Sequence, residues 1–207
     1  MEKIAFYDFD DTLLKHDSMG ILLLYYAKRH PFAWLLAFKL AIMFILYQCH
    51  MIPFLKLKET IIYPLSKMSD EEIEGFYKEA LIPRYYPHVI ETMLKHKANG
   101  VKIWLVSASP EPYLFCIDLP VDKIIGTQVA RENDHWTNHI ISKNCKSEEK
   151  VRRIKEELER LGQTIDYENS YGYSDSDSDY PMLQLVKHRY RIDKKTSEIK
   201  PFIYQKR

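Results

Sequence analysis

The chain has 207 residues, enough for a hydrophobic core in one domain with an insertion or in two small domains. It carries 30 Lys and Arg against 29 Asp and Glu, and this formal charge of +1 gives no overall attraction for nucleic acid, so we expect no nucleic-acid partner. Three widely spaced cysteines without a Cys-x-x-Cys pair argue against a disulfide framework and favour an intracellular protein. No export signal is expected, because the chain runs from residue 3 directly into an apolar segment.

The first predicted element is a buried strand that begins at Lys3 and ends abruptly in carboxylates. Alternate residues of an extended chain share a side, so Asp8 and Asp10 can face one point while Phe9 turns into the core. Two converging carboxylates repel each other unless a cation lies between them or one of them keeps a proton, and Mg²⁺ prefers oxygen ligands. This stretch predicts a magnesium site, with a solubilising turn after an edge strand as the alternative.

An apolar and basic segment follows, from Ser18 to Lys58, which contains five basic residues and no acidic one. Residues 32–54 are long enough for a membrane span, but Lys39 and Pro53 weaken that interpretation. A single span would also separate the first carboxylates from later ones that must join them. We therefore expect two helices, split near Pro31, that lie in the membrane interface or enter it as a hairpin, with basic residues facing anionic headgroups. The alternative is an ordinary helical cap whose apolar residues pack on one another.

Beyond this segment the pattern predicts alternating helices and strands. A capping box from Ser69 to Glu72 starts one helix, and residues 87–97 form another that stops at Asn99-Gly100. A second apolar strand, residues 101–106, runs into Ser107-Ala108-Ser109 and then a helix start. Helix-terminal N–H groups and the Ser107 hydroxyl would make this a phosphate seat. The alternative is a plain serine-capped helix.

Residues 122–129 predict a further strand, and residues 136–141 predict part of a hairpin. His135 and His139 are four residues apart, but their polar surroundings favour a loop and no third ligand follows, so zinc is disfavoured. Residues 147–161 form a strongly amphipathic helix with Ser147 as its cap. Lys150 lies in the first turn of that helix, where the helix dipole disfavours a cation. This placement indicates a functional role, with a solvated lysine as the alternative.

The last motif begins at Asp175 and alternates aspartate with serine. It does not fit an EF-hand calcium loop, because Tyr180 and Val186 stand where that loop needs Gly and Glu. A carboxylate cluster at the end of one more strand, followed by a helix, is the better interpretation. Residues 187–192 then predict a basic strand, and the tail to Arg207 is expected to be peripheral.

Strand and helix signals alternate outside the insertion, which predicts an α/β fold with a doubly wound, mainly parallel sheet and a site beyond the carboxyl ends of its strands. Residues 1–16 and 87–207 would form this core, and residues 17–86 a helical cap inserted after the first strand. Together, the Asp8-x-Asp10-x-Thr12 motif, Ser107 after a strand, Lys150 and the Asp175-Ser176-x-x-Asp179 motif resemble the haloacid dehalogenase-like phosphatases over nearly the whole chain.

Further residues indicate which group within this superfamily the chain resembles. They are the apolar insertion, Cys145, Glu149-Lys150-Val151, Tyr171-Gly172-Tyr173-Ser174-Asp175-Ser176 and His188-Arg189-Tyr190-Arg191. They resemble the IB group, which includes phosphoserine phosphatase, and most closely the phosphatidylglycerophosphatase C family. Asp11 departs from the superfamily pattern, which usually has Gly there, and adds a charge beside the nucleophile. Ser174 also replaces a usual Gly but agrees with the closer family.

The resemblance implies a role for each site residue. Asp8 would be the nucleophile and form an aspartyl-phosphate, while Asp10 would act as general acid and then general base. Mg²⁺ would be held by Asp8, Asp175 and the backbone carbonyl of Asp10, and Asp179 would orient the metal's waters or Lys150. The residues implied to bind phosphate are Asp11, Ser107, Ala108 and Lys150.

The cap of such enzymes covers the active site, so its surface selects the leaving group. An apolar, basic cap suits a phosphomonoester on a diacylglycerol, and the first hypothesis is dephosphorylation of phosphatidylglycerophosphate to phosphatidylglycerol. The cap would then dock on an anionic membrane surface, at the cytoplasmic side of the bacterial inner membrane. Asp17 stands where phosphoserine phosphatases have a substrate-contacting Glu, which supports a soluble small-molecule phosphatase as the alternative. A third hypothesis is a catalytically idle, membrane-docked binding protein, although every expected catalytic side chain is present.

Overall fold

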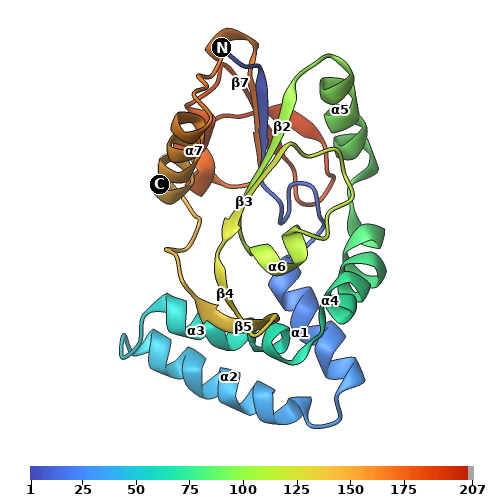
Figure 1. Ribbon diagram of the computed structural model, residues 1–207, viewed down its shortest axis with the longest axis vertical. Coiled ribbons are helices and arrows are strands. Elements are labelled where there is room, and N and C mark those ends of the chain that lie inside the picture. The colour runs from blue at the N-terminus through green and yellow to red at the C-terminus, as the bar shows by residue number, and fades with distance from the viewer. Residues whose placement is uncertain (205–207) are drawn as a thin grey trace.

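The computed structural model describes residues 1–204 (Figure 1). Its strands are β1 (Ile4–Tyr7), β2 (Lys102–Pro110), β3 (Lys123–Thr127), β4 (Val129–Glu132), β5 (His135–Ile140), β6 (Tyr171–Ser174), β7 (His188–Ile192) and β8 (Ile199–Pro201). Its α-helices are α1 (Ser18–Arg29), α2 (Ala33–Gln48), α3 (Phe54–Ile61), α4 (Asp70–Phe76), α5 (Pro87–Ala98), α6 (Glu111–Leu114), α7 (Glu148–Arg160) and α8 (Tyr180–Leu183).

Six strands form one sheet in the order β3-β2-β1-β6-β7-β8. Neighbouring strands from β3 to β7 pair in parallel, and β8 joins the edge antiparallel to β7. The predicted α/β fold with a mainly parallel sheet is therefore confirmed. Because β1, β2 and β6 are adjacent and parallel, their carboxyl ends meet at one edge of the sheet, where the three sequence motifs follow them.

Helices cover both faces of the sheet, with α5 and α7 on opposite sides in Figure 1. The alternation of β1 explains this packing. Ala5 and Tyr7 belong to the buried cluster that includes residues of α5, whereas Ile4 and Phe6 belong to the cluster that includes residues of α7 and α8. Every residue of β1 is buried, as an apolar central strand requires.

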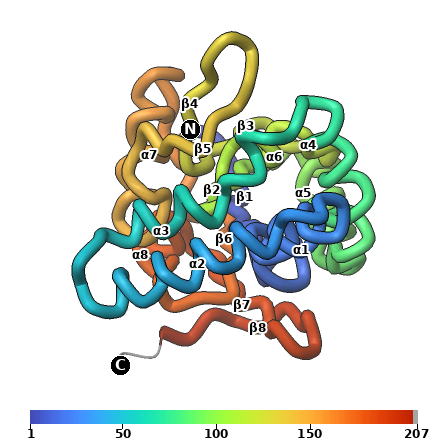
Figure 2. Tube along the Cα trace, turned by 90° about the horizontal axis from the view of Figure 1, so that it is seen from below, coloured from blue at the N-terminus to red at the C-terminus, as the bar shows by residue number. Residues whose placement is uncertain are grey.

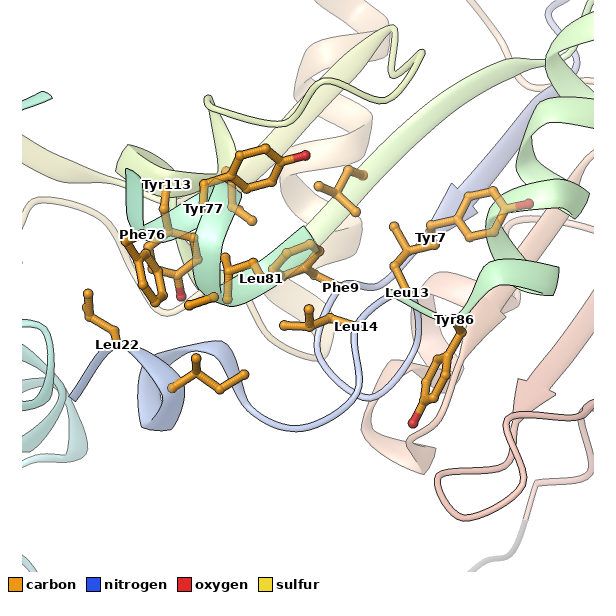
Figure 3. Close-up of a cluster of buried hydrophobic side chains, with 14 of the residues drawn as sticks. Tyr7, Phe9, Leu13, Leu14, Leu22, Phe76, Tyr77, Leu81, Tyr86 and Tyr113 are labelled. Atoms are coloured by element: carbon orange, nitrogen blue, oxygen red, sulfur yellow. The ribbon is translucent and has the colours of Figure 1, made fainter. Parts of the chain in front are cut away.

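The cap elements lie between β1 and α5 in the chain, and they share one hydrophobic cluster with the core. Figure 3 shows Phe9 and Leu14, from the loop after β1, beside Leu81 of the cap, with Leu22 and Phe76 nearby. All of these side chains are fully buried. The predicted helix pair split near residue 31 is confirmed, because α1 ends at Arg29 and α2 begins at Ala33. The predicted capping box is also present at the start of α4.

Helix α2 is apolar and yet mostly exposed. It lies at the end of the molecule farthest from the N-terminus in Figure 1, and Figure 2 shows it crossing the face seen from below. Leu36 is its one buried residue, whereas Trp34 is 63% and Phe38 is 66% exposed. The alternative of apolar residues that pack on one another does not describe this helix. Within residues 1–204, no helix has the length and apolar character needed to cross a membrane.

Three local predictions were wrong. The surroundings of His135 and His139 are not a loop, because residues 135–140 form strand β5, and its antiparallel pairing with β4 confirms the hairpin predicted for residues 136–141. Ser147 precedes α7, but its φ of 52° lies in the left-handed region and its side chain makes no capping hydrogen bond, because caps need an extended backbone there. The tail is not simply peripheral. Strand β8 extends the sheet, and Lys194, from the turn that precedes β8, reaches the site described next.

Candidate active site

A cleft of about 410 Å³ opens where the carboxyl ends of β1, β2 and β6 meet the first turn of α7 and the cap. The structure brings together in this cleft all eight residues that the sequence singles out, which are Asp8, Asp10, Asp11, Ser107, Ala108, Lys150, Asp175 and Asp179. They come from four separate segments of the chain. Three of the segments lie at the carboxyl ends of the adjacent parallel strands β1, β2 and β6, and the fourth is the first turn of α7.

Lys150 links the two carboxylates at the base of the cleft. Its Nζ donates to Oδ1 of Asp8 and to Oδ2 of Asp179, both at 2.8 Å, and its side chain is 2% exposed. Burial disfavours the ammonium, but Asp179 and Asp8 outweigh that cost and raise the pKa of Lys150. Asp179 also accepts from the Ser174 hydroxyl at 2.8 Å, so it is fixed from two sides. The predicted role of Asp179 in orienting Lys150 fits this geometry.

Asp8 is the best placed nucleophile. It follows β1 directly, and its backbone N–H donates to the carbonyl of Tyr173 at 3.1 Å, which fixes its position beside β6. Burial raises the pKa of Asp8 well above its usual value, and Lys150 opposes this by favouring the carboxylate. Lys150 therefore offsets only part of the effect of burial, and a Mg²⁺ ion bound beside Asp8 would favour its carboxylate form further, the form that attacks phosphorus.

Asp10 has a different environment, made of hydroxyl and amide donors. Its Oδ1 accepts from the backbone N–H of Ser18 at 2.7 Å, and its Oδ2 accepts from the Ser109 hydroxyl. Ser18 and Ser109 also contact each other, with their Oγ atoms 2.9 Å apart. Burial is the main cause that raises the pKa of Asp10 to about 6, followed by the nearby charge of Asp17. A carboxyl with this pKa can give and take a proton near neutral pH.

The phosphate seat after β2 is built differently from the prediction. Strand β2 continues to Pro110, and α6 is a single turn that begins at Glu111. Pro110 and Pro112 have no N–H, so helix-terminal amide donors are scarce at this position. The Oγ of Ser107 accepts from the N–H of Ser109 at 3.0 Å, which leaves the hydroxyl hydrogen of Ser107 free to donate.

Asp175 lies opposite Asp8, and two contacts that the sequence did not predict hold it. Lys194, from the turn between β7 and β8, places its Nζ 2.8 Å from Asp175 and 3.0 Å from Asp11. The hydroxyl of Thr12 accepts from the Asp175 N–H at 3.1 Å. Asp11 has a φ of 55°, and its carboxylate turns toward Lys194. The extra charge of Asp11 is thus compensated, and Asp11 could reach a phosphate through its backbone N–H but not through its carboxylate.

The oxygen donors of the cleft fit Mg²⁺. Asp8 and Asp175 offer two carboxylates, and the carbonyl of Asp10 offers a neutral oxygen, a hard ligand set that leaves positions for water and phosphate. No group of three or more His, Cys, Asp and Glu side chains in residues 1–204 is close enough to hold an ion, and His139 instead contacts Glu59 at 3.0 Å. The carboxylate pair in the cleft is the candidate metal site, and its role remains a prediction.

The charge pattern of the cap predicts basic residues that face lipid headgroups, but Lys58 is buried instead. Its Nζ points into the core side of the cleft, where it contacts the carbonyl of Ala108. Arg29 pairs with Glu79 and Lys56 pairs with Glu59, so these two charges are partly neutralised. No local signal separates Lys58 from the other cap lysines, because its burial depends on how α3 packs on the core.

Comparisons with known proteins agree with this fold. The model of the haloacid dehalogenase-like hydrolase family matches residues 5–184. A histidinol-phosphatase of Neisseria meningitidis serogroup C (strain 8013) is 31% identical over 131 residues, and the match covers 59% of this chain and 59% of the relative. The chain thus matches less than two thirds of the length of that curated relative.

Two solved structures share the fold. A protein with unknown function from Bordetella pertussis Tohama I has a TM-score of 0.76 and 22% identity, covering 91% of this chain and 89% of that one. A substrate-bound phosphoserine phosphatase has a TM-score of 0.62 and 15% identity, covering 91% of this chain and 85% of that one. Because the family model spans most of the sequence and the fold agrees, the chain belongs to the haloacid dehalogenase-like hydrolases.

Proposed function

We propose that the chain is a magnesium-dependent phosphomonoesterase that acts through an aspartyl-phosphate on Asp8. The observation that carries this proposal is the contrast between the two carboxyls after β1. Asp8 faces the ammonium of Lys150 at 2.8 Å, whereas Asp10 faces neutral donors and has a pKa of about 6. The pKa of both carboxyls is raised, but only Asp8 has a cation beside it that favours attack as a carboxylate, whereas Asp10 can exchange a proton near neutral pH.

The reaction takes two displacements. An oxygen of Asp8 attacks phosphorus, the bond to the ester oxygen breaks, and Asp10 gives its proton to the departing alcohol. Asp10 then takes a proton from a water that attacks the aspartyl-phosphate, which releases inorganic phosphate and restores Asp8. Ser107 and Lys150 donate to the phosphoryl oxygens, where charge develops. Mg²⁺, held by Asp8, Asp175 and the Asp10 carbonyl, would neutralise phosphate charge.

For the substrate, the surface of the cap favours a lipid phosphomonoester. The apolar face of α2 continues to the mouth of the cleft through Tyr47 and Phe54, which line the cleft and contact each other with ring centroids 5.8 Å apart. A lipid headgroup could enter the cleft while its tails remain with the exposed side chains of α2. Phosphatidylglycerophosphate is the proposed substrate of this class, and the enzyme would then work at the surface of a membrane, with an anionic lipid surface as its partner.

A soluble phosphomonoester is the second candidate, and the comparisons favour it. The named relative is a histidinol-phosphatase, and a solved neighbour is a phosphoserine phosphatase. The substrate in each of these names is a soluble phosphomonoester that carries an amino group. Asp17 lines the cleft and could pair with the ammonium of such a substrate, although its carboxylate also accepts from the Gly20 N–H at the start of α1.

The deciding experiment measures phosphate release with Mg²⁺ from phosphatidylglycerophosphate in mixed micelles, from histidinol phosphate and from phosphoserine. The wild type and Asp8→Asn are compared on each substrate. The first proposal is supported if the wild type releases phosphate fastest from the lipid and Asp8→Asn releases none. The second is supported if the wild type releases phosphate fastest from histidinol phosphate or phosphoserine. If the wild type hydrolyses none of these and no aryl phosphate, the enzyme proposal is wrong and an idle binding protein takes its place.

A further inference from the structure

Lys58 lies in the cap, on α3, but its ammonium reaches the core beside the phosphate seat. Its Nζ donates to the carbonyl of Ala108 at 2.5 Å, to Oγ1 of Thr127 at 2.9 Å and to Oδ1 of Asn144 at 2.6 Å. These contacts use all three donors of the ammonium, and the residue is fully buried. No carboxylate in the described part of the chain forms a salt bridge with it. A buried positive charge thus meets only neutral partners at the edge of the cleft.

This arrangement does not favour folding. Burial lowers the pKa of Lys58 to about 8, which means that the surroundings disfavour its charged form. Asp10 and Asp17 favour the ammonium from beyond salt-bridge distance, but they do not offset the cost of burial. A methionine of similar length would occupy the space without a buried charge. A phosphate bound beside Ser107 would supply the missing negative charge, because Lys58, Ser107 and Ala108 line the same cleft.

A chain of hydrogen bonds connects Lys58 to the Ser107 hydroxyl. The Ala108 carbonyl that accepts from Lys58 belongs to the same peptide group as the N–H of Ser109, and that N–H donates to the Oγ of Ser107 at 3.0 Å. Hydrogen bonds in series polarise one another, so the cation strengthens donation by the Ser109 N–H. The Ser107 hydroxyl then becomes a stronger donor to a phosphate oxygen.

We propose that Lys58 is a cap-borne positioning residue that fixes α3 on the phosphate seat and strengthens the Ser107 donor toward a bound phosphate. This inference rests on the proposed phosphatase function for its role in turnover. The binding of inorganic phosphate tests it separately, because binding a phosphate does not require turnover of an ester. The affinity for phosphate would then depend on α3 of the cap being packed against the core.

The test compares Lys58→Met, Lys58→Arg and the wild type, with Lys56→Met as the matched control. Lys56 lies two residues earlier on α3 and is exposed, paired with Glu59 at 2.8 Å. The dissociation constant of inorganic phosphate is measured by calorimetry with Mg²⁺, kcat and KM are measured with p-nitrophenyl phosphate, and the Tm of each variant is recorded.

In Lys58→Met, phosphate affinity and kcat/KM should both fall by about tenfold, as when groups that support a ligand are removed, while the Tm does not fall. Lys58→Arg should recover most of the loss, and Lys56→Met should match the wild type. Unchanged phosphate affinity in Lys58→Met would overturn the inference, as would a lower Tm in that variant without recovery by arginine. A wild type that binds phosphate but hydrolyses no ester would refute the proposed function alone, and the phosphate affinities would still decide the role of Lys58.

Discussion

Replacing Asp10 by asparagine should stabilise the folded protein and nearly abolish its turnover of alkyl phosphates. Burial raises the pKa of Asp10 to about 6 from a usual value of 3.8, so the folded state binds this proton more tightly than the unfolded chain does. Asp10 therefore lowers stability above pH 6, and its cost fades as pH falls from 6 toward 3.8. The two pKa values differ by an amount that corresponds to about 3 kcal/mol, an upper limit because the side chain is only partly buried.

Asparagine can keep the local hydrogen bonds. Its carbonyl oxygen can accept from the Ser18 N–H, and its amide can donate to the Ser109 hydroxyl, which is able to accept. The free energy of unfolding of Asp10→Asn should thus exceed that of the wild type by up to about 3 kcal/mol at pH 8, and by about half as much at pH 5. Turnover of alkyl phosphates should be nearly lost, because no acid remains to protonate the leaving alcohol.

The assay is urea denaturation of both proteins at pH 5 and pH 8, with EDTA present so that no metal charge acts on the carboxylates. Asp10→Glu serves as a control that keeps the titrating group. Equal stability of the wild type and Asp10→Asn at pH 8 would refute the reasoning. A gain of the same size at both pH values would also refute it, because a pH-independent gain comes from packing or hydrogen bonding and not from the charge of Asp10.

Two further predictions concern the base of the cleft and the cap. Lys150→Met leaves Asp8 and Asp179 buried without their cation. Its free energy of unfolding should therefore be about 3–5 kcal/mol lower than that of the wild type, as measured by urea denaturation of both proteins at pH 7 in EDTA. A loss below 1 kcal/mol would mean that water already solvates the pair. The double variant Trp34→Ser and Phe38→Ser should abolish flotation with anionic vesicles but keep the hydrolysis of p-nitrophenyl phosphate. Leu94→Ser is the control, at an apolar residue of α5 that is 49% exposed, and this variant should float like the wild type. A wild type that stays in solution at low and high salt contradicts membrane docking.

The sheet and the positions of the site residues were predictable because their signals are local. Apolar runs lead into Asp8, Ser107 and Asp175, and the parallel order of the sheet brings these residues to one edge, although β2 continues past Ser107 to Pro110. The amphipathic pattern of α7 likewise placed Lys150 in its first turn, where the structure has it. These inferences needed only periodicity and the rule that ligands bind at the carboxyl edge of such sheets.

The contacts that the sequence did not predict depend on distant parts of the chain. Lys194 meets Asp11 across more than 180 residues, through the hairpin that returns β8 to the sheet, and nothing around Lys194 indicates this. Lys58 looks like any other lysine of a basic segment, and only the packing of α3 buries it. The phosphate seat differed for a chemical reason, because prolines on both sides of Glu111 remove the amide donors that a helix start would provide.

The shared hydrophobic cluster limits how the enzyme can open. Lifting the whole cap as a rigid lid would expose Leu22, Phe76 and Leu81 to water together with the core residues beneath them, at about 25 cal/mol for each Å² of apolar surface. Helix α2 contributes no residue to that cluster, so α2 can move without separating the rest of the cap from the core, although its contacts with α3, such as that of Tyr47 with Phe54, would break. Exchange of substrate and product is therefore expected past the edge of α2, and a lipid surface that holds this helix would favour the open state, the behaviour called interfacial activation.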